Sequence, residues 1–362
     1  MKTPAVLFCE AGGPWHPVAS LTALDRLLVA VHRAGCGPIH VVCKGELPRL
    51  RRATALCIAF ESSAEPPSLE GPVFVASANL LLTVKDVKRL IEQRARLEMP
   101  DGQKLPAGVA KHYSGALEAD LATAPTLAPD GPVALVTDAT SARVATSALW
   151  ASLTSASDGL VDRCFNRPVG RWLSKALIHT AVSPNQISLC ATLIGAASAV
   201  CFGVGTHTAV LMGALLLQFS AIIDCVDGDV ARVLFKESPL GKWLDIIGDQ
   251  IVHIGVFVAI GVGLWRAGVE APVLALAASA GVGVVISFGV VLRSLLDPQL
   301  HRNTALQRLI DATTNRDFSV LLLALALVDR LVWFLWLAAF GVHVFWMVAL
   351  SLQFRRRSPA PA

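Results

Sequence analysis

One run of residues limits the fold of this chain more than any other feature: from Ile187 to Ile223 the sequence contains no Lys, Arg, Asp or Glu. A helix that crosses a bilayer needs about 20 predominantly apolar residues, so this run predicts two membrane-spanning helices joined by a tight turn around residues 203–208. The composition agrees, since 54% of the 362 residues are hydrophobic, 16% are charged and the mean hydropathy is +0.58. These values exclude a soluble protein built around one packed core.

Four further apolar runs predict additional spans, at residues 243–264, 273–292, 317–329 and 331–354, of which 317–329 is short. Six spans place both ends of this region on one side of the membrane. The positive-inside rule marks that side as cytoplasmic, because the opposite turns hold little beyond Arg266 and Arg330, whereas this side carries Arg167, Arg171, Lys175, Arg232, Lys236, Lys242, Arg293, Arg302, Arg308, Arg316, Arg355, Arg356 and Arg357. We therefore expect a multi-pass protein of the cytoplasmic membrane with both termini in the cytoplasm.

Residues 1–155 lack the long apolar runs of the remaining chain, and they predict a soluble, Rossmann-like α/β domain. Short β-rich runs alternate with helical runs, which indicates a mostly parallel sheet. The expected strands lie at residues 5–9, 39–43, 73–75 and 133–136, and the expected helices near 20–34, 84–96 and 141–153. Two proline-containing stretches, 66–72 and 100–108, are expected to be loops.

Charge and cysteine content exclude several functions. The net charge of +4 leaves no large basic surface, so nucleic acid is not an expected partner. The eight cysteines form no C-x-x-C pair, which argues against a zinc site and against a disulfide scaffold. The apolar run before Glu10 is too short for the core of a secretory signal, so we expect the first residues to stay in the cytoplasm.

Residues 156–182 are predicted to form a junction with an amphipathic helix. Asn166 suits the N-cap, and Pro168 suits the first turn, of a helix that runs to about Thr180. At about 100° per residue, basic side chains line one face and apolar ones the other: Arg167, Arg171 and Lys175 against Val169, Trp172, Leu173, Ala176 and Leu177. This pattern is typical of a helix in the membrane interface, and a helix packed on the soluble domain is the alternative. The membrane domain then covers residues 183–354, and a basic cytoplasmic tail covers 355–362.

Four aspartates lie at the ends of otherwise apolar spans, where a charged side chain needs a partner. Asp224 and Asp227 are three residues apart on one predicted helix, and Asp245 and Asp249 are four apart on the next. Each pair therefore projects from a single helix face. Two facing helices could hold one or two divalent ions, and carboxylate oxygens favour Mg²⁺ or Mn²⁺ over softer metals.

Small residues accompany the aspartates on the same faces. Gly228 and Ala231 share the first face, Gly241 and Gly248 share the second, and Arg232 adds a positive charge. Metal ions and an arginine beside a cleared helix face suit a diphosphate. One alternative is that the acids form salt bridges with Arg232, Lys236 and Lys242; another is a pathway for protons or cations. Neither alternative explains the small residues.

These residues resemble the signature of the CDP-alcohol phosphatidyltransferases. The match runs Asp224-x-x-Asp227-Gly228-x-x-Ala231-Arg232, then eight residues, then Gly241-x-x-x-Asp245-x-x-x-Asp249, with every fixed position present. The segment Ser183-Pro184-Asn185 is also similar to the one that opens the first span in that family.

The resemblance implies a six-helix membrane enzyme with a cytoplasm-facing cavity, in which an acceptor hydroxyl displaces CMP from a CDP-linked alcohol. Carried over by position, Asp224, Asp227, Asp245 and Asp249 would bind two Mg²⁺ or Mn²⁺ ions, and Asp249 would also be the general base. The residues expected to contact the CDP group, besides Asp224 and Asp227, are Asn185, Gly228, Ala231, Arg232 and Gly241. A catalytically inactive scaffold or a transporter is the alternative function, and a homodimer is left open.

The sequence identifies the residues that bind the acceptor less clearly than those that bind the CDP group. A phosphorylated acceptor, such as an inositol or glycerol phosphate, would need cationic partners. Arg293, Arg302 and Arg316 are the candidates, with His301 and Arg308 nearby. The same residues could instead serve only to set the topology. Asp317 is expected to pair with Arg316.

The front domain resembles the sugar-nucleotide and CTP-dependent nucleotidyltransferases, and its fusion to the membrane half resembles bifunctional enzymes that make CDP-inositol and then di-myo-inositol phosphate phosphate. Residues 158–168 are similar to the junction of those enzymes. The loop at 10–17 keeps Gly12 and Gly13 but lacks the family's arginine and lysine, and residues 75–79 lack its metal-binding aspartate. We therefore expect a degenerate domain that binds or scaffolds, with an active cytidylyltransferase as the alternative.

Overall fold

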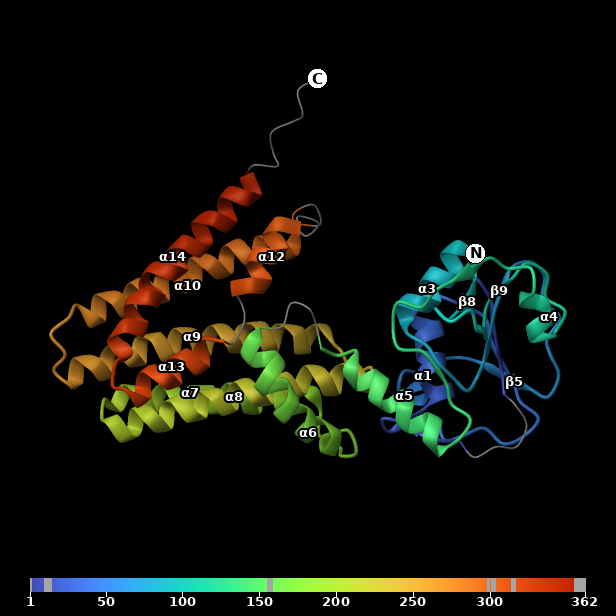
Figure 1. Ribbon diagram of the computed structural model, residues 1–362, viewed down its shortest axis with the longest axis horizontal. Coiled ribbons are helices and arrows are strands. Elements are labelled where there is room, and N and C mark those ends of the chain that lie inside the picture. The colour runs from blue at the N-terminus through green and yellow to red at the C-terminus, as the bar shows by residue number, and fades with distance from the viewer. Residues whose placement is uncertain are drawn as a thin grey trace, which may run out of the picture. The chain divides into compact units, whose positions relative to one another are not determined.

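The computed structural model describes residues 2–9, 15–154, 159–297, 300, 304–313 and 317–354 (Figure 1). The chain divides into two compact units: Met1–Leu153 with Val233–Phe235, and Thr154–Arg232 with Lys236–Ala362. Residues 10–14 of the predicted loop at 10–17, and the basic tail at 355–362, lie outside the described residues.

The first unit is an α/β domain around a seven-stranded sheet in the order β10-β8-β9-β6-β1-β4-β5. β1 pairs in parallel with both β4 and β6, and β9 runs antiparallel to its neighbours β6 and β8. The strands are β1 (Ala5–Phe8), β4 (Ile39–Val42), β5 (Glu61–Ser63), β6 (Val73–Ser77), β8 (Arg96–Glu98), β9 (Lys104–Ala110) and β10 (Thr126–Leu127). The parallel centre confirms the α/β domain that the alternating sequence predicts.

Outside this sheet, the described part of the unit has five helices: α1 (Ala23–Arg33), α2 (Arg52–Ala55), α3 (Val84–Gln93), α4 (Leu117–Leu121) and α5 (Ala139–Ala151). It also has two small antiparallel ribbons, β2 (Pro17–Val18) with β3 (Leu21–Thr22) and β7 (Leu80–Leu81) with β11 (Ala134–Leu135). Polar side chains start the longer helices, since Thr22 caps α1, Thr83 caps α3 and Asp138 caps α5. The expected strand at 133–136 is shorter than predicted, because only Ala134 and Leu135 pair, and they pair with β7 outside the seven-stranded sheet.

The expected loop at 100–108 is also wrong, because Lys104–Ala110 forms the longest strand of the sheet. Pro106 and Gly108 suggested a loop, but the β8–β9 register shifts between Arg96 and Glu98, so Pro106 lies at an irregular part of the ladder. A Cβ on Gly108 would lie 2.7 Å from the carbonyl oxygen of Ala95. Glycine is used here because two backbones approach closely.

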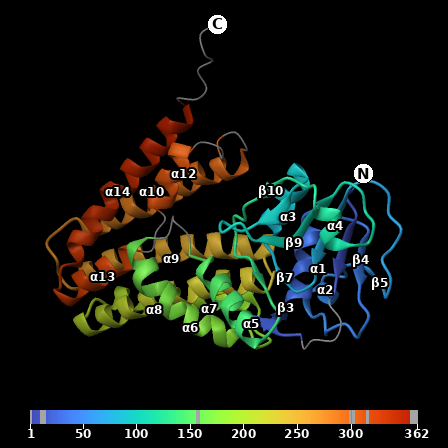
Figure 2. The same ribbon diagram turned by 45° about the vertical axis from the view of Figure 1, so that its right-hand side comes forward.

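The second unit is helical, and five helices in its described part are long and apolar enough to cross a membrane. These are α7 (Pro184–Val204), α8 (His207–Val233), α9 (Pro239–Arg266), α10 (Val273–Leu296) and α14 (Leu331–Phe354). In Figures 1 and 2, α7, α8 and α9 run side by side, and α10 lies along α14. Gly205 adopts φ +83° between α7 and α8, which confirms the predicted tight turn.

Among the described residues, three shorter α-helices accompany the long ones: α6 (Arg167–Leu177), α12 (Thr304–Thr313) and α13 (Phe318–Leu327). α13 occupies the expected fifth span but has 10 residues. At 1.5 Å per residue it is about 15 Å long, half of a hydrocarbon core of about 30 Å. Five candidate spans are therefore established among the described residues.

The junction helix begins differently from the prediction. Asn166 has helical backbone angles and makes no capping bond, because it ends a π-helical turn, Asp162–Asn166, that continues directly into α6. Gly170 and Ser174 are buried on one side of α6, while Trp172 keeps 79% of its surface exposed. A Cβ on Gly170 would lie 3.1 Å from the carbonyl oxygen of Ile222, so the backbone of α6 lies close to α8.

Candidate functional site

The four predicted aspartates lie where α8 and α9 face each other. Asp224 and Asp227 come from α8, and Asp245 and Asp249 from α9. Asp224, Asp227 and Asp245 offer carboxylate oxygens that all lie within 4.8 Å of one another, and these three form the acidic group found among the described residues. Such a group of oxygen ligands could hold a divalent ion.

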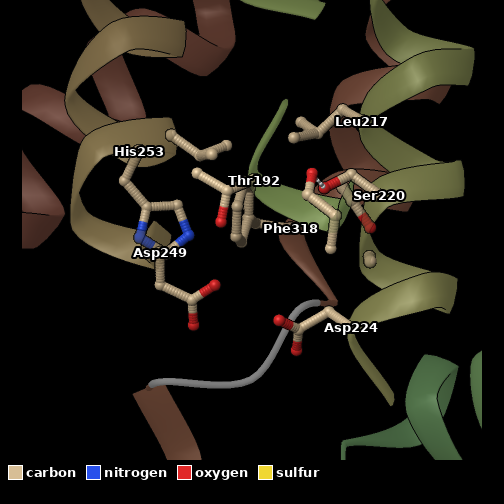
Figure 3. Close-up of a pocket in the computed structure, with 11 residues that line it drawn as sticks. Thr192, Leu217, Ser220, Asp224, Asp249, His253 and Phe318 are labelled. Atoms are coloured by element: carbon tan, nitrogen blue, oxygen red, sulfur yellow. Dashed lines mark hydrogen bonds between the residues drawn. The ribbon is translucent and has the colours of Figure 1, made fainter. Parts of the chain in front are cut away.

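Asp249 lines a small cavity on one side of this group. Figure 3 shows its carboxylate across the cavity from that of Asp224, with the imidazole of His253 beside it. The volume is about 30 Å³, room for about one water or one hydroxyl group. The full lining is Ala191, Thr192, Leu217, Ser220, Ala221, Asp224, Asp249, Val252, His253, Phe318 and Ser319.

Apart from Asp224 and Asp249, the polar residues of this cavity were not predicted from the sequence. His253 lies one helical turn after Asp249, and its ring meets Phe318 edge-on at 5.1 Å between centroids. The i, i+4 spacing from Asp249 could have identified His253. Thr192, Ser220 and Ser319 gave no such signal, because isolated hydroxyls are common in membrane helices.

A larger cavity of about 200 Å³ opens on the other side of the acidic group. It brings together six of the residues expected to contact the CDP group: Asn185, Asp227, Gly228, Ala231, Arg232 and Gly241. Lys236 and Lys242 line it too, although the sequence analysis considered them only as basic residues of the cytoplasmic side and as partners in an alternative salt-bridge scheme. Pro184, Ser188, Glu237, Ser238 and Asp245 complete the lining. We refer to it as the Arg232 cavity.

Local capping and close packing hold the walls of the Arg232 cavity. Ser183 and Gln186 form a capping box at the start of α7, and Ser238 caps α9. A Cβ on Gly241 would lie 2.7 Å from Asn185 Oδ1, so glycine lets the start of α9 approach Asn185. On the same wall, the Ser188 hydroxyl donates to Asp227 Oδ2.

An acid at a variable position of the predicted motif contacts a residue of the Arg232 cavity. Asp229 follows Gly228 on α8 and is buried, and its Oδ1 accepts from Arg232 Nη2 at 2.8 Å and from Arg167 Nη1 at 3.1 Å. Arg232 therefore has an acidic partner that is none of the four predicted aspartates. The i, i+3 spacing of Asp229 and Arg232 was the available signal.

A chain of buried side-chain hydrogen bonds reaches the Asp249 cavity from the junction. Asn166 Nδ2 donates to Asp162 at 2.7 Å, Gln218 Nε2 donates to Asn166 Oδ1 at 2.5 Å, and the Ser319 hydroxyl donates to Gln218 Oε1 at 2.8 Å. Ser319 lines the cavity. Asn166, expected as a cap, instead links the junction to α8.

Asp317 is tied to the same junction. Its carboxylate accepts from the backbone N–H groups of Leu160 and Val161, both at 3.0 Å. The partner expected for Asp317, Arg316, lies outside the described residues. The start of α13 is thus fixed to the junction by backbone donors.

The candidate acceptor residues are only partly described. Arg293 places its guanidinium 5.7 Å from the ring centroid of Phe354, and among the described residues it lines neither of the two cavities. Arg302 and Arg316 lie outside the described residues. Their assignment to an acceptor stays a prediction.

The membrane half matches a known family. Residues 181–353, a little under half of the chain, match the model of the CDP-alcohol phosphatidyltransferases. This match confirms, for these residues, the resemblance drawn from the aspartate motif.

Curated relatives match over a shorter length. The chain is 36% identical over 110 residues to the bifunctional IPC transferase and DIPP synthase of Archaeoglobus fulgidus, and 35% identical over 103 residues to the protein of that name from Thermococcus kodakarensis. These stretches cover 30% and 28% of this chain, but 21% and 22% of the two relatives. The chain therefore spans only about a fifth of the length of the curated relatives it matches.

Solved structures of one enzyme are also similar. The phosphatidylinositol phosphate synthase of Mycobacterium tuberculosis with CDP-DAG bound is 16% identical, with a TM-score of 0.38, over 51% of this chain and 93% of that one. The same enzyme in complex with manganese and citrate gives 17% identity and a TM-score of 0.38, over 51% and 88%.

Proposed function

We propose, from the match of residues 181–353 to the CDP-alcohol phosphatidyltransferases, that the membrane half transfers a phosphoalcohol group from a CDP-alcohol to an acceptor hydroxyl and releases CMP. The observation that carries this proposal is the convergence of three carboxylates within 4.8 Å beside a cavity lined by Arg232, Lys236 and Lys242. An acidic group with cationic neighbours suits a metal-bound diphosphate.

The acidic group fits a divalent cation, because its donors are all carboxylate oxygens. We assign Asp224, Asp227 and Asp245 as ligands of Mg²⁺ or Mn²⁺, and Asp249 as a further ligand of a two-ion site. A bound ion would neutralise charge on the diphosphate and on the departing CMP.

In the proposed reaction, residues of the two cavities have different roles. Asn185, Arg232 and the two lysines bind and orient the CDP group in the Arg232 cavity. Asp249, on the other side, accepts the proton of the acceptor hydroxyl. The freed oxygen attacks the phosphorus that carries the alcohol, and the bond from that phosphorus to the CMP oxygen breaks. The phosphoalcohol ends on the acceptor, and CMP leaves with the electron pair.

The membrane arrangement follows from the same proposal. We assign α13 as a sixth, short span, with both termini on the cytoplasmic side of the cytoplasmic membrane, where CDP-alcohols and divalent ions would reach the site. The donor, lipids and a hydroxyl acceptor, phosphorylated or not, are the proposed partners.

Identifying the products tests the proposed function directly. Purified full-length protein is offered CDP-diacylglycerol or CDP-inositol with Mg²⁺ or Mn²⁺ and a panel of acceptors that includes inositol, inositol phosphate and glycerol phosphate. We expect CMP together with one phosphoalcohol-linked product, detected by mass spectrometry. No CMP with any pair would contradict the proposal and favour an inactive scaffold or a transporter.

The front domain is proposed to bind or scaffold rather than to make the donor. The loop at 10–17 offers no Arg or Lys, and residues 75–79 offer no carboxylate, so triphosphate and metal binding would be weak. The full-length protein should therefore release no pyrophosphate from CTP, Mg²⁺ and inositol phosphate. Pyrophosphate formed in step with CDP-inositol would show instead that the chain is bifunctional.

A further inference from the structure

We propose that Asp229, which occupies a variable position of the predicted motif, is a positioning residue that holds Arg232 ready for the diphosphate of the donor. The proposal rests on the proposed function for the identity of the donor. It assigns to the site an acid that touches neither of the two described cavities and acts through the arginine.

The burial of Asp229 shows why this carboxylate needs an explanation. Its side chain is 1% exposed, in a helix long and apolar enough to span a membrane. Two arginines meet its Oδ1, while its Oδ2 is buried with no hydrogen-bond partner among the described residues. Burying a carboxylate with one oxygen unpaired is costly. A role beyond packing would account for its presence.

The geometry connects Asp229 to the Arg232 cavity. Arg232 lies one turn after Asp229, and its Nη1 is 3.0 Å from the position of a Cβ on Gly228. The guanidinium therefore lies against the bare surface of Gly228, which lines the cavity. Arg232 is itself 42% exposed, so without Asp229 its long side chain would sample many rotamers. Holding the guanidinium of Arg232 in place reduces the conformational entropy that its side chain loses when a phosphate binds.

Arg167 extends this arrangement to the junction helix. It comes from the first turn of α6, is 14% exposed, and donates to the oxygen that also accepts from Arg232. The second cation offsets the charge of Asp229, so the carboxylate is anchored from two helices. Removing Arg167 should therefore weaken, but not abolish, the ability of Asp229 to position Arg232.

A purely structural role for Asp229 makes a different prediction. If the acid only balanced charge during folding, its removal would lower stability without changing donor affinity. If it positions Arg232, its removal should raise the KM of the donor far more than it lowers kcat, and only while Arg232 is present. A double-mutant cycle separates the two roles.

The test compares Asp229→Asn, Arg232→Gln and the double variant in the full-length protein. We measure the KM and kcat of CMP release with the donor and acceptor that the wild type uses, and the affinity for CDP with Mn²⁺ by calorimetry. Asp229→Asn should raise the donor KM and weaken CDP binding about tenfold, but should change neither in the Arg232→Gln background. Asp329→Asn, the same change at an exposed acid, is the matched control and should leave both values unchanged.

Two further variants keep the result decisive if Asp229→Asn is unstable. Asp229→Glu keeps the charge and should give an intermediate KM, and Arg167→Gln should raise KM less than Asp229→Asn. Equal KM and equal CDP affinity in folded variants and wild type would overturn the positioning role while leaving the transfer reaction intact. CDP binding that depends on the pair, without any CMP release, would overturn the proposed reaction alone. Wild-type protein that neither binds CDP nor releases CMP would overturn both.

Discussion

Asp249→Asn is expected to lower the kcat of CMP release by about a thousandfold. The amide has nearly the same shape but cannot accept a proton from the acceptor hydroxyl, and it binds a divalent ion poorly. Asp249 lines the cavity of about 30 Å³, which leaves room for little more than that hydroxyl group. Among the described residues, the only other carboxylate that lines this cavity is that of Asp224, which we assign to the metal.

The rate is followed as CMP released by the purified variant at saturating donor and acceptor. Unchanged thermal unfolding shows that the loss is chemical, and Asp329→Asn, at an exposed acid, should retain wild-type turnover. Undiminished turnover by Asp249→Asn would rule out Asp249 as the base.

Removal of divalent ions should have an effect of similar size. EDTA is expected to reduce CMP release to background, and Mg²⁺ or Mn²⁺ should restore it, because the three carboxylates within 4.8 Å repel one another without a cation. Activity is measured after dialysis against EDTA and then on titration with each metal.

Variants of the ligands make the metal prediction specific to this site. Asp245→Asn removes one of the three oxygens and should raise the metal concentration for half-maximal activity at least tenfold, since even the loss of an outer-shell partner costs about 10–100-fold. Full activity in EDTA, or an unchanged metal requirement in Asp245→Asn, would contradict the assignment.

Long apolar runs made the membrane helices easy to predict. The last helix was predicted at 331–354 and is Leu331–Phe354, and the turn after Val204 lies where the first uncharged run was divided. In such runs every local preference agrees with the final structure. The strand that contains Pro106 and Gly108 was missed because its bulge and its close backbone contact depend on neighbouring strands that the local sequence does not reveal.

The acidic group could be predicted for a related reason. Helical spacing places Asp224 with Asp227 on one helix, and the facing helix supplies Asp245. Spacing gives the direction of a side chain but not the lateral distance between helices, so it could not place Asp249 in a separate cavity. Asp229 was missed because one of the two arginines that contact it, Arg167, is more than 60 residues away in the sequence.

The hydrogen bonds of Asn166 and Asp317 change where the membrane half can be considered to begin. Family similarity starts at residue 181, yet Leu160, Val161 and Asn166 hold the start of α13 and, through Gln218, the wall of the Asp249 cavity. The segment before residue 181 is thus part of the membrane unit rather than a spacer. An exchange of front domains, by recombination or in the laboratory, would need its crossover point before Gly159 to keep this wall intact.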